Sequence, residues 1–243
     1  RAAAQAAADR AGPDCLVMPS FHEVESPDAS LSNKVLILLE DDRPGSVAEA
    51  MVNAVRDRLR SLAEGAFAAV RVPEGAFFRD QAMQQVADLP EIYWASAEVR
   101  ADRPYPEARR LAAHLLASRK ARRDFAPVTW GAPVPKSSLD GARESVLHED
   151  LYGTPKRRTE RQFKQLNPSK LHGGTGARPG ERLSGVDLLK RLGHKAARDQ
   201  FGDRVPGAQV LSTSHVASWT TRRSLAAAAP RQEWISAFRE YRD

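Results

Sequence analysis

Cysteine is almost absent from this chain, which has Cys15 as the single cysteine among its 243 residues. One cysteine excludes an internal disulfide and any metal site that needs several thiolates. Long apolar runs are also missing, because none approaches the roughly 18 residues that a membrane-spanning helix needs. The alanine-rich start lacks a signal peptide's order of basic, apolar and cleavage regions, so we expect a cytoplasmic protein with no membrane contact. The sequence does not begin with Met, and we expect a fragment of a longer protein.

Charge is unevenly distributed along the chain. Residues 1–99 carry 9 Lys/Arg and 16 Asp/Glu, a net charge of −7, whereas residues 100–243 carry 28 and 15, a net charge of +13. Such asymmetry suggests that the second half faces a polyanion. The simpler alternative is a solvated basic surface on a chain rich in Arg and Ala.

The first 103 residues predict an α+β domain. Three short apolar runs have the composition of strands, at 15–18, 35–39 and 92–99. Between the second and third runs, Ser46 and Glu49 form an S-x-x-E capping box, followed by an apolar stripe at helical spacing that Gly65 should end. Strand, helix and strand in this order fit a small ferredoxin-like sheet with helices on one face.

The remainder, residues 104–243, predicts a mainly helical and basic domain. Helices are expected at 107–125, 186–198, from 213 onward, and at 231–241. A tract at about 128–180 is rich in Pro, Gly, Ser, Lys and Arg and predicts loops with short elements. Its Gly173–Gly176 run has neither P-loop spacing nor a preceding strand, so we interpret it as a flexible linker.

Five motifs, in one order along the chain, carry a resemblance to a known family. They are residues 12–20 (GPDCLVMPS), 29–36 (ASLSNKVL), 91–94 (EIYW), 180–192 (GERLSGVDLLKRL) and 211–217 (LSTSHVA). They resemble motifs of the large subunit of type III-B CRISPR effector complexes, the Cas-ten or Cmr-two family. The tract 145–178 contributes nothing to the resemblance.

The resemblance implies a first palm domain, related in shape to nucleotide cyclases, followed by the helical domain. Such a piece would be a non-catalytic scaffold that docks neighbouring effector subunits, guide RNA and target RNA. It would support a palm outside this chain that makes cyclic oligoadenylates from ATP with Mg²⁺ or Mn²⁺. Neither the family's GGDD turn nor its HD nuclease motif occurs here, so we expect no catalytic residue and no cofactor in this chain and leave open whether the parent protein is an enzyme.

In the same family a K-C-x-x-C-G motif opens a zinc site in the second domain. Here Ser137 and Asp140 stand where those cysteines would be, and Ser184 stands where the GERL motif often has a cysteine. Structural zinc needs thiolate or imidazole ligands, so we predict no zinc and a loop held by hydrogen bonds or partner contacts. His148 and His172 in the neighbouring loops are interpreted as surface residues.

Two sets of residues are candidate contacts. The resemblance implies nucleotide contact at Ser30, Ser32, Asn33 and Lys34, which are otherwise ordinary turn formers. Contacts with RNA or a partner protein are expected at Arg119, Lys120, Arg122, Arg123, Lys156, Arg157, Arg158, Arg182, Lys190 and Arg191. The alternative function is a free-standing basic RNA-binding or structural module unrelated to CRISPR, for which Tyr93 or Trp94 would have to stack on bases.

Overall fold

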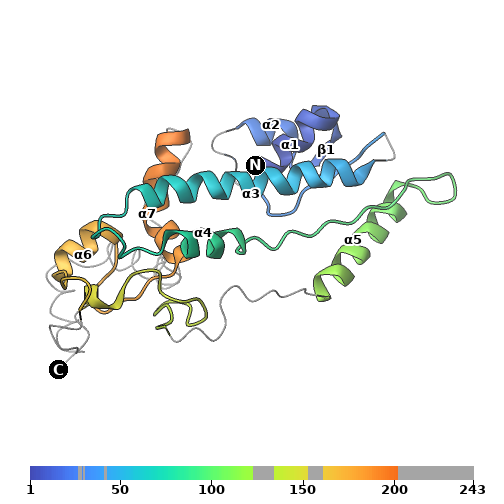
Figure 1. The fold of residues 1–243 in the computed structure, drawn as a ribbon. Helices are drawn as coiled ribbons and strands as arrows, with labels where there is room; N and C mark the ends of the chain where they lie inside the picture. The colour runs from blue at the N-terminus through green and yellow to red at the C-terminus, as the bar shows by residue number, and fades with distance from the viewer. Residues whose placement is uncertain (27–28, 30, 41–42, 123–133, 153–160, 202–243) are drawn as a thin grey trace, which may run out of the picture. The chain divides into compact units, whose positions relative to one another are not determined.

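The computed structural model describes residues 1–26, 29, 31–40, 43–122, 134–152 and 161–201 (Figure 1). These residues are mainly helical, with one antiparallel sheet of two short strands. The helices are α1 (Ala2–Ala11), α2 (Phe21–Glu25), α3 (Pro44–Ala68), α4 (Arg79–Ala87), α5 (Tyr105–Ala121), α6 (Pro168–Thr175) and α7 (Gly185–Phe201), with 3-10 turns η1 (Pro13–Cys15) and η2 (Glu149–Tyr152). The strands are β1 (Leu16–Met18) and β2 (Leu36–Ile37). In the part of the chain described here, no helix has the length and apolarity needed to cross a membrane.

A first apolar cluster joins α1, α2 and the sheet to the start of α3. The face of α1 that meets α3 is built from alanines, of which Ala4 and Ala7 are completely buried. Small side chains let two helix backbones approach closely, and α1 and α3 make an extensive contact. The guanidinium of Arg1 donates hydrogen bonds to the carbonyl oxygens of Val24 and Ser26, both at 2.7 Å, which fix α2 against α1.

A second and larger cluster surrounds the C-terminal half of α3. The helices α4 and α7 pack on it, and two fully buried leucines join it, Leu147 from the loop before η2 and Leu151 from η2 itself. Gly65 lies where α3 meets α7, because a Cβ built there would lie 2.8 Å from the Cβ of Ala196. The prediction that Gly65 ends the helix is therefore wrong: α3 continues to Ala68, and Gly65 is needed for the helix crossing.

The predicted strands had mixed outcomes. The first two are confirmed as β1 and β2, which pair with the register Leu16↔Ile37. The third, at 92–99, is wrong: this segment is not assigned to a strand and is followed by a tight turn in which Arg100 and Arg103 bond to each other. The described residues thus show a mixed, mostly helical α+β fold with two strands, whereas a ferredoxin-like sheet has four.

The predicted helix is confirmed as α3, but the prediction of a capping box formed by Ser46 and Glu49 is wrong. The N-cap residue is Arg43 and Pro44 occupies the first turn, a position where the missing proline N–H costs nothing. The hydroxyl of Ser46 donates to the Arg43 carbonyl oxygen at 3.1 Å rather than accepting from Glu49. The predicted helices at 107–125 and 186–198 correspond to α5 and α7, and those after residue 201 lie outside the described residues.

Candidate functional site

The two segments that stand at zinc-ligand positions of the resembled family lie together in the structure. The hydroxyls of Ser137 and Ser184 both donate to Oδ2 of Asp187, at 2.7 Å and 2.6 Å, and the backbone N–H of Ser184 donates to the same oxygen at 2.9 Å. All three residues are at most 4% exposed. Ser184 Oγ in turn accepts the Asp187 N–H at 3.3 Å, so the pair also forms a capping box at the start of α7. We call Ser137, Ser184 and Asp187 the serine–aspartate cluster.

The loop 136–144 is folded around this cluster by its own hydrogen bonds. Ser137 Oγ accepts the N–H of Leu139 at 3.0 Å, and Asp140 Oδ1 accepts the N–H groups of Ala142 at 2.9 Å and Arg143 at 3.0 Å. Burial alone would raise the pKa of Asp140, but the hydrogen bonds from Arg143 and Ala142 outweigh it and hold this pKa below its usual value. The hydrogen bonds expected in this loop are therefore present, and partner contacts, the other expected means of holding it, stay a prediction.

A buried amide ties the loop to two helices. Gln85, on α4, is completely buried; its Nε2 donates to the carbonyl oxygen of Glu144 at 3.1 Å, and its Oε1 accepts the N–H of Gly185 at 2.7 Å. The Glu144 carboxylate is also buried and forms an ion pair with Lys136. The loop, α4 and the start of α7 therefore form one connected polar network inside the second cluster.

We expect the purified chain to contain no stoichiometric zinc. The serine–aspartate cluster supplies hydroxyls and one carboxylate, which are poor substitutes for thiolate or imidazole ligands. In the described residues, no group of three or more His, Cys, Asp or Glu side chains could hold a metal ion. Elemental analysis after gel filtration would measure the metal content. One tightly held zinc per chain would contradict this prediction and would mean that Asp140, His148 or His172 had been recruited.

Two of the predicted RNA or partner contacts are occupied within the fold. Arg182 donates to both oxygens of Glu149, each at 2.7 Å, and its guanidinium lies 5.4 Å from the centre of the Tyr152 ring. Burial raises the pKa of Tyr152 to about 12. Arg191 pairs with Glu181 at 2.9 Å and also donates to the Gly176 carbonyl oxygen. Both arginines therefore stabilise the fold around α7.

The basic residues at the end of α5 are exposed. Arg119, Lys120 and Arg122 have no side-chain partner among the described residues. At 100° per residue, Arg119 lies on the same face of α5 as Leu111 and Leu115, of which Leu115 is 45% exposed, and Arg122 is the C-cap residue just after the helix. Lys190 is exposed on α7. Arg123, Lys156, Arg157 and Arg158 lie outside the described residues.

The predicted nucleotide contacts precede β2. Ser32, Asn33 and Lys34 are exposed, and Ser32 Oγ accepts the Lys34 N–H at 3.1 Å, a turn formed by the serine side chain. Ser30 lies outside the described residues. Nucleotide contact at this turn stays a prediction.

Sequence reasoning missed a group of contacting rings. The His148 ring lies 4.8 Å from that of Phe163 and 6.1 Å from that of Phe78, measured between centroids. The interpretation of His148 as a surface residue is wrong, because its side chain is only 22% exposed. His172, by contrast, is exposed as predicted. The three ring residues are widely spaced in the sequence, and no periodicity connects them.

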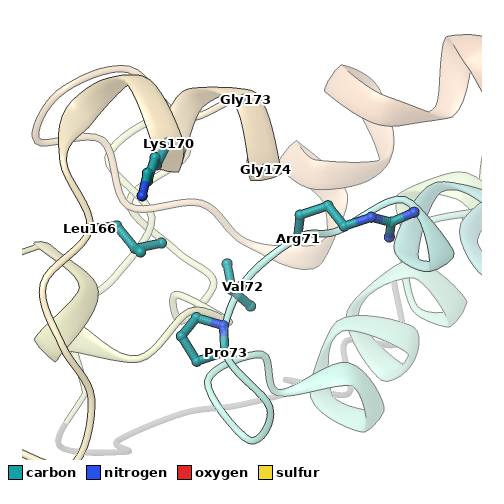
Figure 2. A pocket seen from close by; sticks show the side chains of 7 residues that line it. All are labelled: Arg71, Val72, Pro73, Leu166, Lys170, Gly173 and Gly174. Carbon is teal, nitrogen blue, oxygen red and sulfur yellow. The ribbon is translucent and has the colours of Figure 1, made fainter.

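The run Gly173–Gly176 is ordered, so its interpretation as a flexible linker is wrong. It forms the C-terminal part of α6 and caps that helix at Gly176, whose φ of 74° suits glycine. Beside it is an open pocket of about 490 Å³, shown in Figure 2, into which the Lys170 side chain points. The pocket is lined by Arg71, Val72, Pro73, Leu166, Lys170, Gly173 and Gly174. Of the two cations in this lining, Arg71 donates hydrogen bonds to the carbonyl oxygens of Ala68 and Val70, and Val72, Pro73 and Leu166 make the neighbouring wall apolar.

Comparison with known proteins adds no assignment: no model of a protein family, no curated protein and no solved structure matches this chain.

Proposed function

We propose that this chain is a non-catalytic scaffold from the large subunit of a type III CRISPR effector. It docks neighbouring effector subunits and contacts guide and target RNA in the cytoplasm. It supports cyclic oligoadenylate synthesis by a palm outside this chain, which supplies the ATP and divalent-cation site. In this proposal residues 1–103 belong to a ferredoxin-like palm and residues 104–243 form the basic helical domain.

The observation that carries the proposal is the meeting of Ser137 with Ser184. The resemblance puts both residues at positions where the family has cysteines, and ligands of one metal ion must lie side by side. The two hydroxyls, 47 positions apart in the sequence, share one carboxylate oxygen of Asp187. A chance resemblance gives no reason for these two motif positions to meet. The contact therefore supports the alignment of this domain with the family, with a carboxylate at the centre in place of an ion.

The test is to capture the chain from its native cells and to sequence the RNA that accompanies it. The proposal predicts short RNAs that share a repeat-derived 5′ end, together with other effector subunits. The alternative function, a free-standing basic module, predicts mixed cellular RNA without a common end. Recovery of mixed RNA alone, or of no RNA, would reject the CRISPR assignment.

Replacing Arg119, Lys120 and Arg122 together with Ala should weaken binding of single-stranded RNA, on the order of tenfold at low salt. These side chains are exposed and without partners in the described residues, so their removal leaves the fold intact. Loss of three phosphate contacts should also flatten the slope of log affinity against log salt by about 2. Fluorescence anisotropy with a labelled RNA, repeated over a salt series, measures both quantities.

The matched control replaces Arg56, Arg58 and Arg60 on α3 with Ala, which removes the same charge from the acidic half of the chain. It should change neither affinity nor slope appreciably. Equal losses in both variants would show that only net charge matters. An unchanged affinity in the α5 variant, together with lost assembly in a pull-down, would assign the α5 residues to a protein partner.

A further inference from the structure

The group formed by Phe78, His148 and Phe163 is open to solvent on one side. Phe78 is 38% exposed although its ring is in contact with that of His148. His148 is itself packed edge-on against Phe163. Its Nδ1 accepts the Asp150 N–H at 3.2 Å, so the imidazole is held in place behind the exposed ring. The result is a supported aromatic surface rather than a loose side chain.

A pocket of about 450 Å³ adjoins the exposed ring, within the size range of small-ligand sites. It is lined by Phe77, Phe78, Arg79, Asp80 and Gln81. The side chains of Arg79, Asp80 and Gln81 have no hydrogen-bond partner among the described residues, although they stand beside an apolar wall. The pocket thus combines an aromatic wall with a guanidinium, a carboxylate and an amide, all available for hydrogen bonds.

We propose that this pocket binds one unpaired nucleobase, which stacks on Phe78 while Asp80 and Gln81 bond its edge. A base has two apolar faces and a rim of donors and acceptors, and this combination matches the wall and the free polar groups. Arg79 is exposed beside the ring and is placed to meet a neighbouring phosphate. An apolar protein side chain of similar size would offer no partners to these polar groups, whereas the edge of a base bonds to them.

The ligand must be single-stranded, because a base inside a duplex has both faces covered by its neighbours and its edge paired. The site therefore adds base stacking to the phosphate contacts that the proposed function assigns to α5. The choice of RNA as its ligand rests on that proposed function. The same chemistry would accept the base of a free nucleotide, and the experiment separates the two sources.

The experiment measures binding of the full chain to an unstructured RNA, to the same sequence as a duplex, and to free AMP. For the unmodified protein we expect tighter binding of the single strand than of the duplex once salt has weakened the phosphate contacts. Phe78→Leu should weaken single-strand binding by about fivefold or more, which is the value of one stacked base, without changing the salt slope. Phe78→Trp, which keeps an aromatic ring at this position, should bind the single strand about as tightly as the unmodified chain. A 2-aminopurine base in the strand should lose fluorescence on binding to the unmodified chain and not to Phe78→Leu.

The matched control is Val99→Ala, which shortens another exposed apolar side chain, 46% exposed, that does not line the pocket. It should bind RNA normally. If Phe78→Leu fails to fold, the double variant D80A/Q81A tests the same site through the free polar groups and should show the same loss with an unchanged salt slope. RNA binding that is equal in all these variants overturns the nucleobase site alone. If AMP binds in a way that depends on Phe78 and no RNA binds, the nucleobase site stands and the proposed RNA-binding function is rejected. If neither AMP nor RNA binds, the nucleobase site and the RNA-binding function are both rejected.

Discussion

Asp187→Ala should lower the free energy of unfolding by about 3–5 kcal/mol. One oxygen of this carboxylate accepts three hydrogen bonds, from Ser137 Oγ, Ser184 Oγ and Ser184 N. Alanine would leave these donors buried without an acceptor, and each buried unsatisfied group costs about 1–3 kcal/mol. It would also remove the capping interaction at the start of α7. Urea denaturation followed by circular dichroism measures the loss.

The matched control is Asp88→Ala, at an exposed position just after α4, which should stay within about 0.5 kcal/mol of the unmodified chain. Ser137→Ala and Ser184→Ala each remove one donor and should cost less than Asp187→Ala, because the carboxylate keeps other partners. An Asp187→Ala loss below 1 kcal/mol would mean that the serine–aspartate cluster does not hold the loop. The loop would then depend on its apolar contacts and on the Gln85 network.

The helices were predictable from the sequence where one face is buried. Val186, Leu189 and Leu192 have helical spacing and belong to the buried side of α7. The completely buried Leu188 falls outside that stripe, because α7 contacts both α3 and α4 and so buries a broader face. Hydrophobic periodicity identifies one buried face of a helix well, but it does not reveal that a second helix packs beside that face.

The third strand failed for a related reason. The segment 92–99 has the aromatic and β-branched composition of a strand, but a strand exists only when a neighbour pairs with it. The pairing partner is information from the tertiary fold that the local composition does not contain. Local composition therefore could not show that this segment lies outside the sheet.

The serine–aspartate cluster was partly predictable. Ser137 and Ser184 were singled out by resemblance, but Asp187 was not, although the sequence holds a signal for it. The spacing S-x-x-D occurs at 137–140 and again at 184–187, and the second copy starts a helix, where S-x-x-D is a capping box. What the sequence could not show is that the two copies meet on one carboxylate.

The glycines of α6 show how a long-range contact reverses a local interpretation. Adjacent glycines favour a flexible linker, since glycine loses the most conformational freedom on folding. In the structure Gly174 instead lies against the backbone of Arg71, whose N–H donates to the Gly174 carbonyl oxygen at 2.8 Å. A Cβ built at Gly174 would lie 2.1 Å from the Arg71 carbonyl oxygen. The glycine therefore permits a close approach of two backbones, and Figure 2 labels both residues beside the pocket.

Gly174→Ala should therefore destabilise the protein far more than Gly173→Ala. At Gly174 the new methyl group collides with a backbone carbonyl, which cannot rotate away as a side chain can, so we expect a loss of about 3 kcal/mol or more. At Gly173 nothing lies within 4 Å of the new Cβ, so alanine should be neutral or should stabilise α6 by up to about 1 kcal/mol. The two variants differ by one position in the same helix and add the same methyl group, so each controls for the other. Thermal and urea denaturation of both variants measure the difference, and equal effects at the two positions would show that α6 does not pack on Arg71.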